Sequence, residues 1–432
     1  MNFLQKSFVT VVGKFLGAFL TLFISILLAR ILGVADVGKY QLMVTSQTMA
    51  ITFLAMGFGN ATIYIVNNLK ENKSKVVSNT FKFYSIISII FTFIFFYILY
   101  INTDYFGNYS YFPLFIFSLG AGSLLLYNIL LPILYIDLDV IKLQILSILS
   151  SFLLLTGLVL YYFLASLNID LVLFLVGISN IVSLLLLIYF IRKQIRLEIK
   201  LDFVLLRKIF IYGIKISSTN LVFIFSSNVV VFLLKHFNTN GFEDIGLYSR
   251  ATAIINIFTM LPSSIGPLIY SKWASSKINV LHIQVEKTIR ILTFLSFICF
   301  ILVLLGGDFV ITFLYGKEFI MAKGALLILC GSIVFTSIIL VLTNLFSSIG
   351  KPMVTLLTFT ISLIITFLFS SILIPIYGIE GAAFSVLIGA IYNAIHLLIV
   401  TKKVISINLI KSFIIRKTDI EEIKHLLKFK KI

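Results

Sequence analysis

Charge is scarce in this sequence. Asp, Glu, Lys and Arg make up only 12% of the 432 residues, whereas soluble proteins contain about 25%. Hydrophobic residues make up 60%, and Phe alone occurs 43 times. This composition excludes an ordinary soluble domain. It predicts an all-α polytopic membrane protein, because uninterrupted helices satisfy their own backbone groups in lipid.

Several kinds of functional residue are also rare or absent. The two cysteines, Cys299 and Cys330, both lie in apolar runs, so we expect free buried thiols and no disulfide. The four histidines show no metal-ligand spacing, and no Walker loop occurs. We therefore expect no metal, no cofactor and no use of ATP.

Apolar runs of about twenty residues, the length that crosses a bilayer, are abundant. We expect twelve transmembrane helices at about 8–32, 40–66, 80–101, 111–136, 141–165, 169–191, 209–234, 246–271, 288–312, 322–349, 353–375 and 380–401.

The net charge of +17 comes from basic residues that gather in alternate loops. This pattern argues against nucleic-acid binding, and the positive-inside rule places both termini in the cytoplasm. Short outer loops leave no room for a soluble domain. The expected segments are an N-terminal six-helix bundle (1–191), a cytoplasmic amphipathic linker (192–208), a C-terminal six-helix bundle (209–401) and a basic cytoplasmic tail (402–432). We expect the linker to contact membrane lipids, and for the tail we weigh lipid contact equally against a solvated basic helix.

A short motif occurs once in each half. Residues 33–40 read Gly-Val-Ala-Asp-Val-Gly-Lys-Tyr, and residues 241–248 read Gly-Phe-Glu-Asp-Ile-Gly-Leu-Tyr. Repeated halves are typical of transporters. In each copy we expect the first glycine to close a helix with φ > 0, Asp to cap the next helix and Tyr to lie at headgroup depth. The motif residues are Gly33, Asp36, Gly38, Tyr40, Gly241, Asp244, Gly246 and Tyr248.

Ionisable residues inside the spans are few, and each is a candidate site because charge in hydrocarbon is costly. No Asp or Glu lies in the middle of a predicted span, whereas Lys14, Lys215 and Arg250 lie within or at the start of one. A cavity with cations and no carboxylates favours an anionic cargo such as a phosphate. Snorkelling of the two lysines, or contact of Arg250 with outer headgroups, is the alternative. The polar cavity candidates are Asn60, Asn220, Asn228 and Asn256.

Prolines are also few, six in all, and two of them fall near the middle of the eighth predicted span. Pro262 and Pro267 would free backbone carbonyls and bend that helix. We expect the bend to line the cavity, either as a hinge or as a static kink. Pro375 and Gly378 predict a second break at the outer end of the eleventh span.

The segment Leu28–Tyr40, the second motif, the Pro262–Pro267 stretch, Tyr315–Phe319 and Pro375–Ala383 together resemble the bacterial polysaccharide flippases of O-antigen type. These belong to the multidrug/oligosaccharidyl-lipid/polysaccharide exporter superfamily. The resemblance implies two six-helix bundles that form a V around a central cavity. It also implies that an undecaprenyl-diphosphate-linked oligosaccharide moves from the inner to the outer leaflet of the bacterial plasma membrane by alternating access.

In such a transporter, Lys14, Lys215 and Arg250 would attract the diphosphate and glycan, and a proton or sodium gradient would be coupled to transport. Relatives often carry an acidic residue in a stretch that matches Ser227–Val229, and its absence here puts that coupling scheme in doubt. Polymerase and chain-length proteins of an O-antigen, lipopolysaccharide or capsule pathway are candidate partners. The alternatives are a multidrug or cation antiporter of the same fold and a polysaccharide polymerase or ligase.

Overall fold

A computed structural model describes residues 3–414 and 416, except 138, 165–167, 197–199, 238–239 and 275–277. Within these residues every regular element is helical, and nine stretches are long and apolar enough to cross a membrane. The chain is therefore a multi-pass membrane protein, as the composition predicted. The nine stretches are consistent with twelve spans, because two of them contain a glycine break and α10 adds one more.

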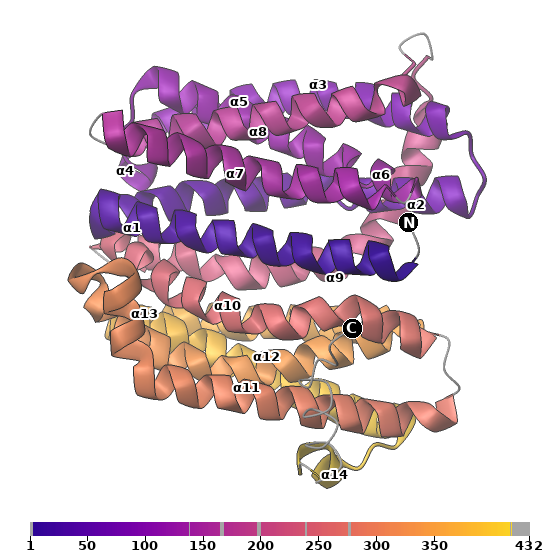
Figure 1. Cartoon of the computed structure of the whole chain (residues 1–432), viewed down its shortest axis with the longest axis vertical. Helices are drawn as coiled ribbons and strands as arrows, with labels where there is room; N and C mark the ends of the chain where they lie inside the picture. Colours follow the sequence, from indigo (N-terminus) through magenta and orange to yellow (C-terminus); the bar gives the residue numbers. More distant parts are fainter. Residues whose placement is uncertain are drawn as a thin grey trace. The chain divides into compact units, whose positions relative to one another are not determined.

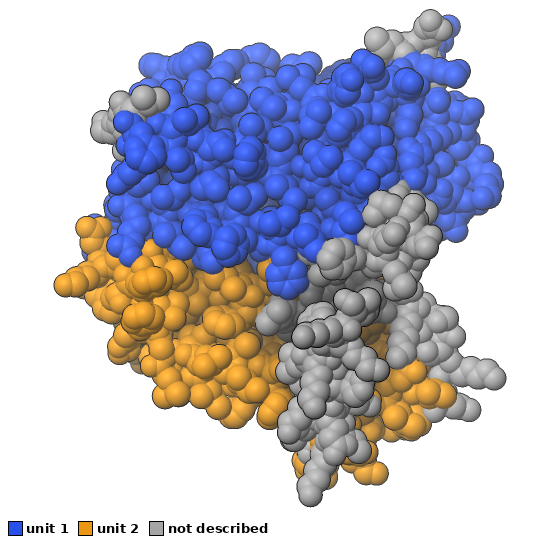
Figure 2. Space-filling view, in the orientation of Figure 1, with its two compact units in different colours: residues 1–235, 239–246 blue, residues 236–238, 247–432 orange. Residues whose placement is uncertain are grey.

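The chain divides into two compact units (Figures 1 and 2). The first comprises residues 1–235 and 239–246, and the second comprises residues 236–238 and 247–432. In the first unit α5 packs on both α3 and α8, and α1 packs on α7. Its elements are α1 (Phe3–Ala55), α2 (Phe58–Asn67), α3 (Lys73–Ile101), α4 (Thr103–Phe106), α5 (Tyr111–Leu130), α6 (Ile133–Ile136), α7 (Val140–Leu164), α8 (Ile169–Ile191), η1 (Arg192–Gln194) and α9 (Phe203–Phe237).

The second unit is built around α12, which packs on both α11 and α13. Its elements are α10 (Gly241–Ala274, whose first turns belong to the first unit), α11 (Ile278–Tyr315), η2 (Lys317–Ala322), α12 (Lys323–Ser348), α13 (Pro352–Ile405) and α14 (Leu409–Phe413).

Glycines with positive φ divide the longest helices into spans. Gly33, at φ 74°, breaks α1, and Gly378, at φ 54°, breaks α13 three residues after Pro375. Both breaks were predicted, because glycine adopts this conformation without a steric cost. A third break, at Gly57 with φ 69°, separates α1 from α2 and was not predicted.

The first unit also includes α9 as far as Lys235, the helix with which the predicted C-terminal bundle begins. The physical reason is a close contact with the break between α1 and α2. A Cβ built on Gly57 would lie 1.9 Å from Ser217 Oγ, and one built on Gly213 would lie 2.8 Å from the carbonyl oxygen of Met56. Two glycines thus let α9 approach the broken backbone closely.

Hydrogen bonds hold the segment between the predicted bundles against the first unit. The backbone N–H of Asp202 donates to Asn79 Oδ1 at 2.6 Å, and that of Arg196 donates to Ser78 Oγ at 2.8 Å. The Asp202 carboxylate also forms a 2.7 Å ion pair with Lys75. The described part of 192–208 is therefore docked on the first turns of α3.

Candidate functional site

The two copies of the repeated motif meet within the first unit. A Cβ on Gly38 would lie 1.7 Å from the carbonyl oxygen of Phe242, and one on Gly246 would lie 2.1 Å from that of Val34. Gly38 and Gly246 occupy the same position of the two motifs. The sixth residue of each copy must therefore be glycine, because the backbone of the other copy fills the space of a side chain.

The remaining motif residues behave differently in the two copies. Gly33 has positive φ as predicted, but Gly241 does not, so that prediction is wrong for the second copy. Gly241 instead makes a tight contact, since its Cβ would lie 3.1 Å from Lys235 Cα. Only 3% of Tyr248 is exposed, and its expected position at headgroup depth stays a prediction. Its ring is packed inside the protein.

The two predicted caps of the motif differ as well. Asp36 forms a 2.8 Å ion pair with Lys39, three residues later, and Tyr40 is half-buried. Asp244 lies in the first turn of α10, where its backbone N–H donates to the carbonyl oxygen of Asn240. A carboxylate in a first turn interacts favourably with the helix dipole.

Two lysines lie against one ring at this contact. Lys235 Nζ is 3.5 Å and Lys39 Nζ is 5.8 Å from the centroid of the Phe242 ring. Each distance is within the range of a cation–π interaction. Sequence reasoning missed this pair, although Lys39 lies within the first motif copy and Lys235 six residues before the second. The arrangement concentrates positive charge at the end of the first unit that the loop charges predict to be outside.

The three predicted cavity cations lie in different environments. Lys14 on α1 and Lys215 on α9 have exposed side chains. Arg250 on α10 is only 3% exposed, and its guanidinium lies 5.6 Å from the Tyr315 ring centroid. Within the second unit, Arg250 is therefore packed on an aromatic ring in this conformation.

Helical phase shows which way the lysines face. On α9, the buried Gly213 and Ser217 face the break between α1 and α2. Lys215 lies two residues after Gly213, which at about 100° per residue places it on the opposite side of α9. On α1 the contact with α7 involves Gly13, and Lys14 lies about 100° around the helix from it. Neither lysine therefore faces the helix contact beside it.

The predicted polar candidates are largely accessible. Asn60, Asn220 and Asn256 are exposed, and Asn228 is half-buried with its Nδ2 donating to the carbonyl oxygen of Ile224 at 2.8 Å. The side chains of Pro262 and Pro267 lie outside the described residues, so the predicted hinge remains a prediction. In the described part of the chain no group of three or more His, Cys, Asp or Glu is placed to hold a metal.

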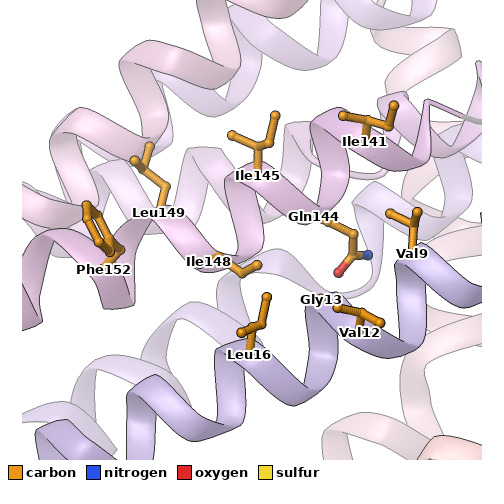
Figure 3. A pocket seen from close by; sticks show the side chains of 10 residues that line it. All are labelled: Val9, Val12, Gly13, Leu16, Ile141, Gln144, Ile145, Ile148, Leu149 and Phe152. Atoms are coloured by element: carbon orange, nitrogen blue, oxygen red, sulfur yellow. The ribbon is translucent and has the colours of Figure 1, made fainter.

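An open groove of about 430 Å³ lies between α1 and α7 (Figure 3). Its lining is almost entirely apolar and includes Val12 and Leu16 on α1 and Ile145 and Phe152 on α7. The Gln144 amide points toward Gly13, where a Cβ would lie 2.0 Å from Oε1. Lys14 is not among the residues that line it. This groove therefore suits a hydrocarbon chain and is not the cationic site.

Comparison with known proteins shows the family and the fold of this chain. A family model described as "Polysaccharide biosynthesis protein" matches residues 3–270. The chain belongs to this family. The matched residues include both motif copies and all three candidate cations. No curated protein matches the chain.

Solved structures of the superfamily named by the resemblance share the fold. An inward-facing multidrug resistance MATE family transporter has a TM-score of 0.76 at 14% identity, covering 93% of this chain and 98% of its own. The lipid II flippase MurJ in an inward closed conformation also has a TM-score of 0.76 at 14% identity, covering 99% and 94%. A superfamily transporter from Pyrococcus furiosus has a TM-score of 0.66 at 15% identity, covering 92% and 93%. At these identities the likeness shows the fold of flippases and transporters.

Proposed function

We propose that this protein is a flippase for undecaprenyl-diphosphate-linked oligosaccharide units in polysaccharide biosynthesis. It would move them from the inner to the outer leaflet of the bacterial plasma membrane, with both termini in the cytoplasm. Family membership over both motif copies is the observation that carries the proposal. The fold shared with a lipid II flippase supports a lipid-linked cargo.

The chemistry of the membrane-spanning helices fits that cargo. The exposed Lys14 and Lys215 and the exposed amides of Asn60, Asn220 and Asn256 would be costly against hydrocarbon. A water-filled chamber would satisfy them. There the lysines would attract the diphosphate and the amides would bind glycan hydroxyls, because ammonium groups pair with phosphate oxygens and amides both donate and accept.

The same chemistry separates this function from its alternatives. A carrier of organic cations needs carboxylates in its chamber, and this chain has none in the middle of a predicted span. A polymerase or ligase needs catalytic groups on large outer loops, and the loops here are short. We therefore infer a transporter without catalytic activity. Transport would be coupled to a proton or sodium gradient, and polymerase and chain-length proteins of the same pathway would take up the product.

Deleting the gene tests the proposal against both alternatives. A strain without the flippase should accumulate single lipid-linked units on the inner leaflet and lose surface polysaccharide, with unchanged drug sensitivity. Accumulation of single units on the outer leaflet would indicate a polymerase. Hypersensitivity to cationic drugs with normal surface polysaccharide would indicate a drug antiporter, and either result would overturn the proposal.

A further inference from the structure

The chain after the last membrane-spanning helix folds back onto the second unit. α13 ends at Ile405, and Ser406, at φ 54°, turns the chain. Asn408 then caps α14, its Oδ1 accepting from the Lys411 N–H at 3.1 Å. Ile407 and Ser412 are 2% and 0% exposed. The segment from Ser406 to Ile414, here called the foot, is thus a folded part of the second unit.

Two charged side chains of α11 hold the foot by its backbone. Glu286 Oε1 accepts from the Asn408 N–H at 2.6 Å, and Arg290 Nη1 donates to the carbonyl oxygen of Lys411 at 2.7 Å. Glu286 and Arg290 are 9% and 4% exposed and lie one helical turn apart. Buried charges require partners of this kind. The attachment fixes which side of the foot faces away from the protein.

The outward side of the foot is apolar. Ile410, Phe413 and Ile414 are 72%, 45% and 61% exposed. Ile410 and Phe413, three residues apart in α14, share one face of the helix, and Ile414 follows directly as its C-cap. Three large exposed apolar side chains on so short a segment need a nonpolar environment to bury them.

Basic residues surround this apolar face. Lys402 and Lys403 form the last turn of α13, Lys411 lies within α14, and all three side chains are exposed. Apolar side chains flanked by lysines are the signature of a segment that lies in the interface of an anionic membrane. The loop charges independently predict that this end of the chain is cytoplasmic, where the leaflet is anionic.

We propose that the foot is a binding site for anionic phospholipid headgroups of the inner leaflet. Ile410, Phe413 and Ile414 insert among the acyl chains, and the lysines contact lipid phosphates. Glu286 and Arg290 are positioning residues that hold the foot at this depth. The proposal rests on the second unit alone and does not depend on the transported cargo. For the described part of the tail, it favours lipid contact over a solvated basic helix.

Fluorescence in nanodiscs tests the proposal on the full chain. In a Cys299→Ser, Cys330→Ala background, Ile410→Cys carries an environment-sensitive label. Quenching by nitroxide-labelled lipid is compared with quenching by aqueous acrylamide, in phosphatidylcholine with and without phosphatidylglycerol. We expect lipid quenching that increases with phosphatidylglycerol and decreases with salt, because the attraction is electrostatic.

Charge reversal provides the matched control. The pair Lys403→Glu and Lys411→Glu should lower the ratio of lipid-contacting to water-exposed label about tenfold or more, since each basic residue near an anionic leaflet contributes about fivefold. The pair Lys193→Glu and Lys200→Glu, which makes the same change of charge in the first unit, should leave the ratio unchanged. Unaltered thermal unfolding of both variants would show that the fold is intact.

Two outcomes would overturn the proposal. Equal lipid quenching with and without phosphatidylglycerol would show apolar insertion without recognition of anionic headgroups. Quenching by acrylamide alone would place the apolar face in water, where a protein partner is the alternative occupant.

Discussion

At the scale of single residues, the contact between the two motif copies most strongly restricts which residue types can occupy its positions. Gly38 and Gly246 each face a backbone carbonyl of the other copy. Since a backbone cannot rotate away as a side chain can, any added atom must displace a helix. Overpacking of this kind costs about 1–3 kcal/mol.

Gly38→Ala and Gly246→Ala should therefore each lower the thermal unfolding temperature of the purified protein and reduce surface polysaccharide. Gly306→Ala is the matched control, because a Cβ there meets no atom within 4 Å. In a helix, that change should be neutral or stabilising by up to about 1 kcal/mol. If all three variants unfold at the same temperature, the two motif copies do not pack as closely as described.

A second prediction for a single residue is that transport depends on the positive charge of Lys14. Lys14→Ala should reduce transport about tenfold or more, the size of a lost hydrogen bond to a charged group, whereas Lys14→Arg should retain most of it. Surface polysaccharide and the leaflet of the lipid-linked unit are the measurements. Lys323→Ala, which breaks an exposed ion pair with Asp308 on the predicted outer side, serves as the control. Equal transport by the Ala and Arg variants would show that the lysine only snorkels.

The sequence predicted residues whose role is local and missed those whose role depends on distant partners. The positive φ of Gly33 and Gly378 follows from a glycine at the end of an apolar run. The close contact of Gly57 with Ser217 could not be predicted, because it depends on how α9 packs against the first unit. The burial of Arg250 against Tyr315 is of the same kind.

At the scale of elements, the hydrophobic runs predicted the position of nearly every helix. They did not predict which helices α9 packs against. The count of apolar runs predicted six helices on each side of the linker. In the structure, the glycines Gly57 and Gly213 bring α9 close to the break between α1 and α2 in the first unit. Length and composition therefore define spans, whereas small residues decide which spans pack together.

The docked linker gives a prediction about pH. A hydrogen bond from Lys75, followed by one from the Leu205 N–H, lowers the pKa of Asp202 below its usual value near 3.8. A lowered pKa means that the folded state favours the carboxylate. Its contribution to stability is present above the usual value and is lost as the pH falls through the lowered one.

Asp202→Asn should therefore lower the unfolding temperature slightly at neutral pH, because Asn keeps the helix cap but loses the ion pair. The difference in unfolding temperature between Asp202→Asn and the wild type should disappear once the pH falls below the lowered pKa of Asp202. Asp104→Asn, the same change at an exposed aspartate of α4 that makes no ion pair within the described residues, is the control for the substitution itself. If the unfolding temperature of Asp202→Asn stays below that of the wild type in acid, the loss of stability comes from the helix cap rather than from the ion pair.

At the scale of the whole molecule, the duplicated motif, the scarcity of charge and the placement of the remaining cations all support the proposed flippase function. A membrane protein whose spans carry exposed lysines and amides but no central carboxylates is suited to an anionic, hydrophilic head. The family match and the fold shared with flippases support the same conclusion. In the proposed flippase, side chains at the surface of the chamber would select the sugar.

The most direct measurement is translocation by the purified protein. Proteoliposomes would contain an undecaprenyl-diphosphate-linked oligosaccharide in one leaflet, and an added glycan-modifying enzyme would report its arrival in the other under a proton or sodium gradient. We predict transfer well above protein-free liposomes and its loss when Lys14 and Lys215 are both changed to alanine. Transfer no faster than in protein-free liposomes, under either gradient, would contradict the account.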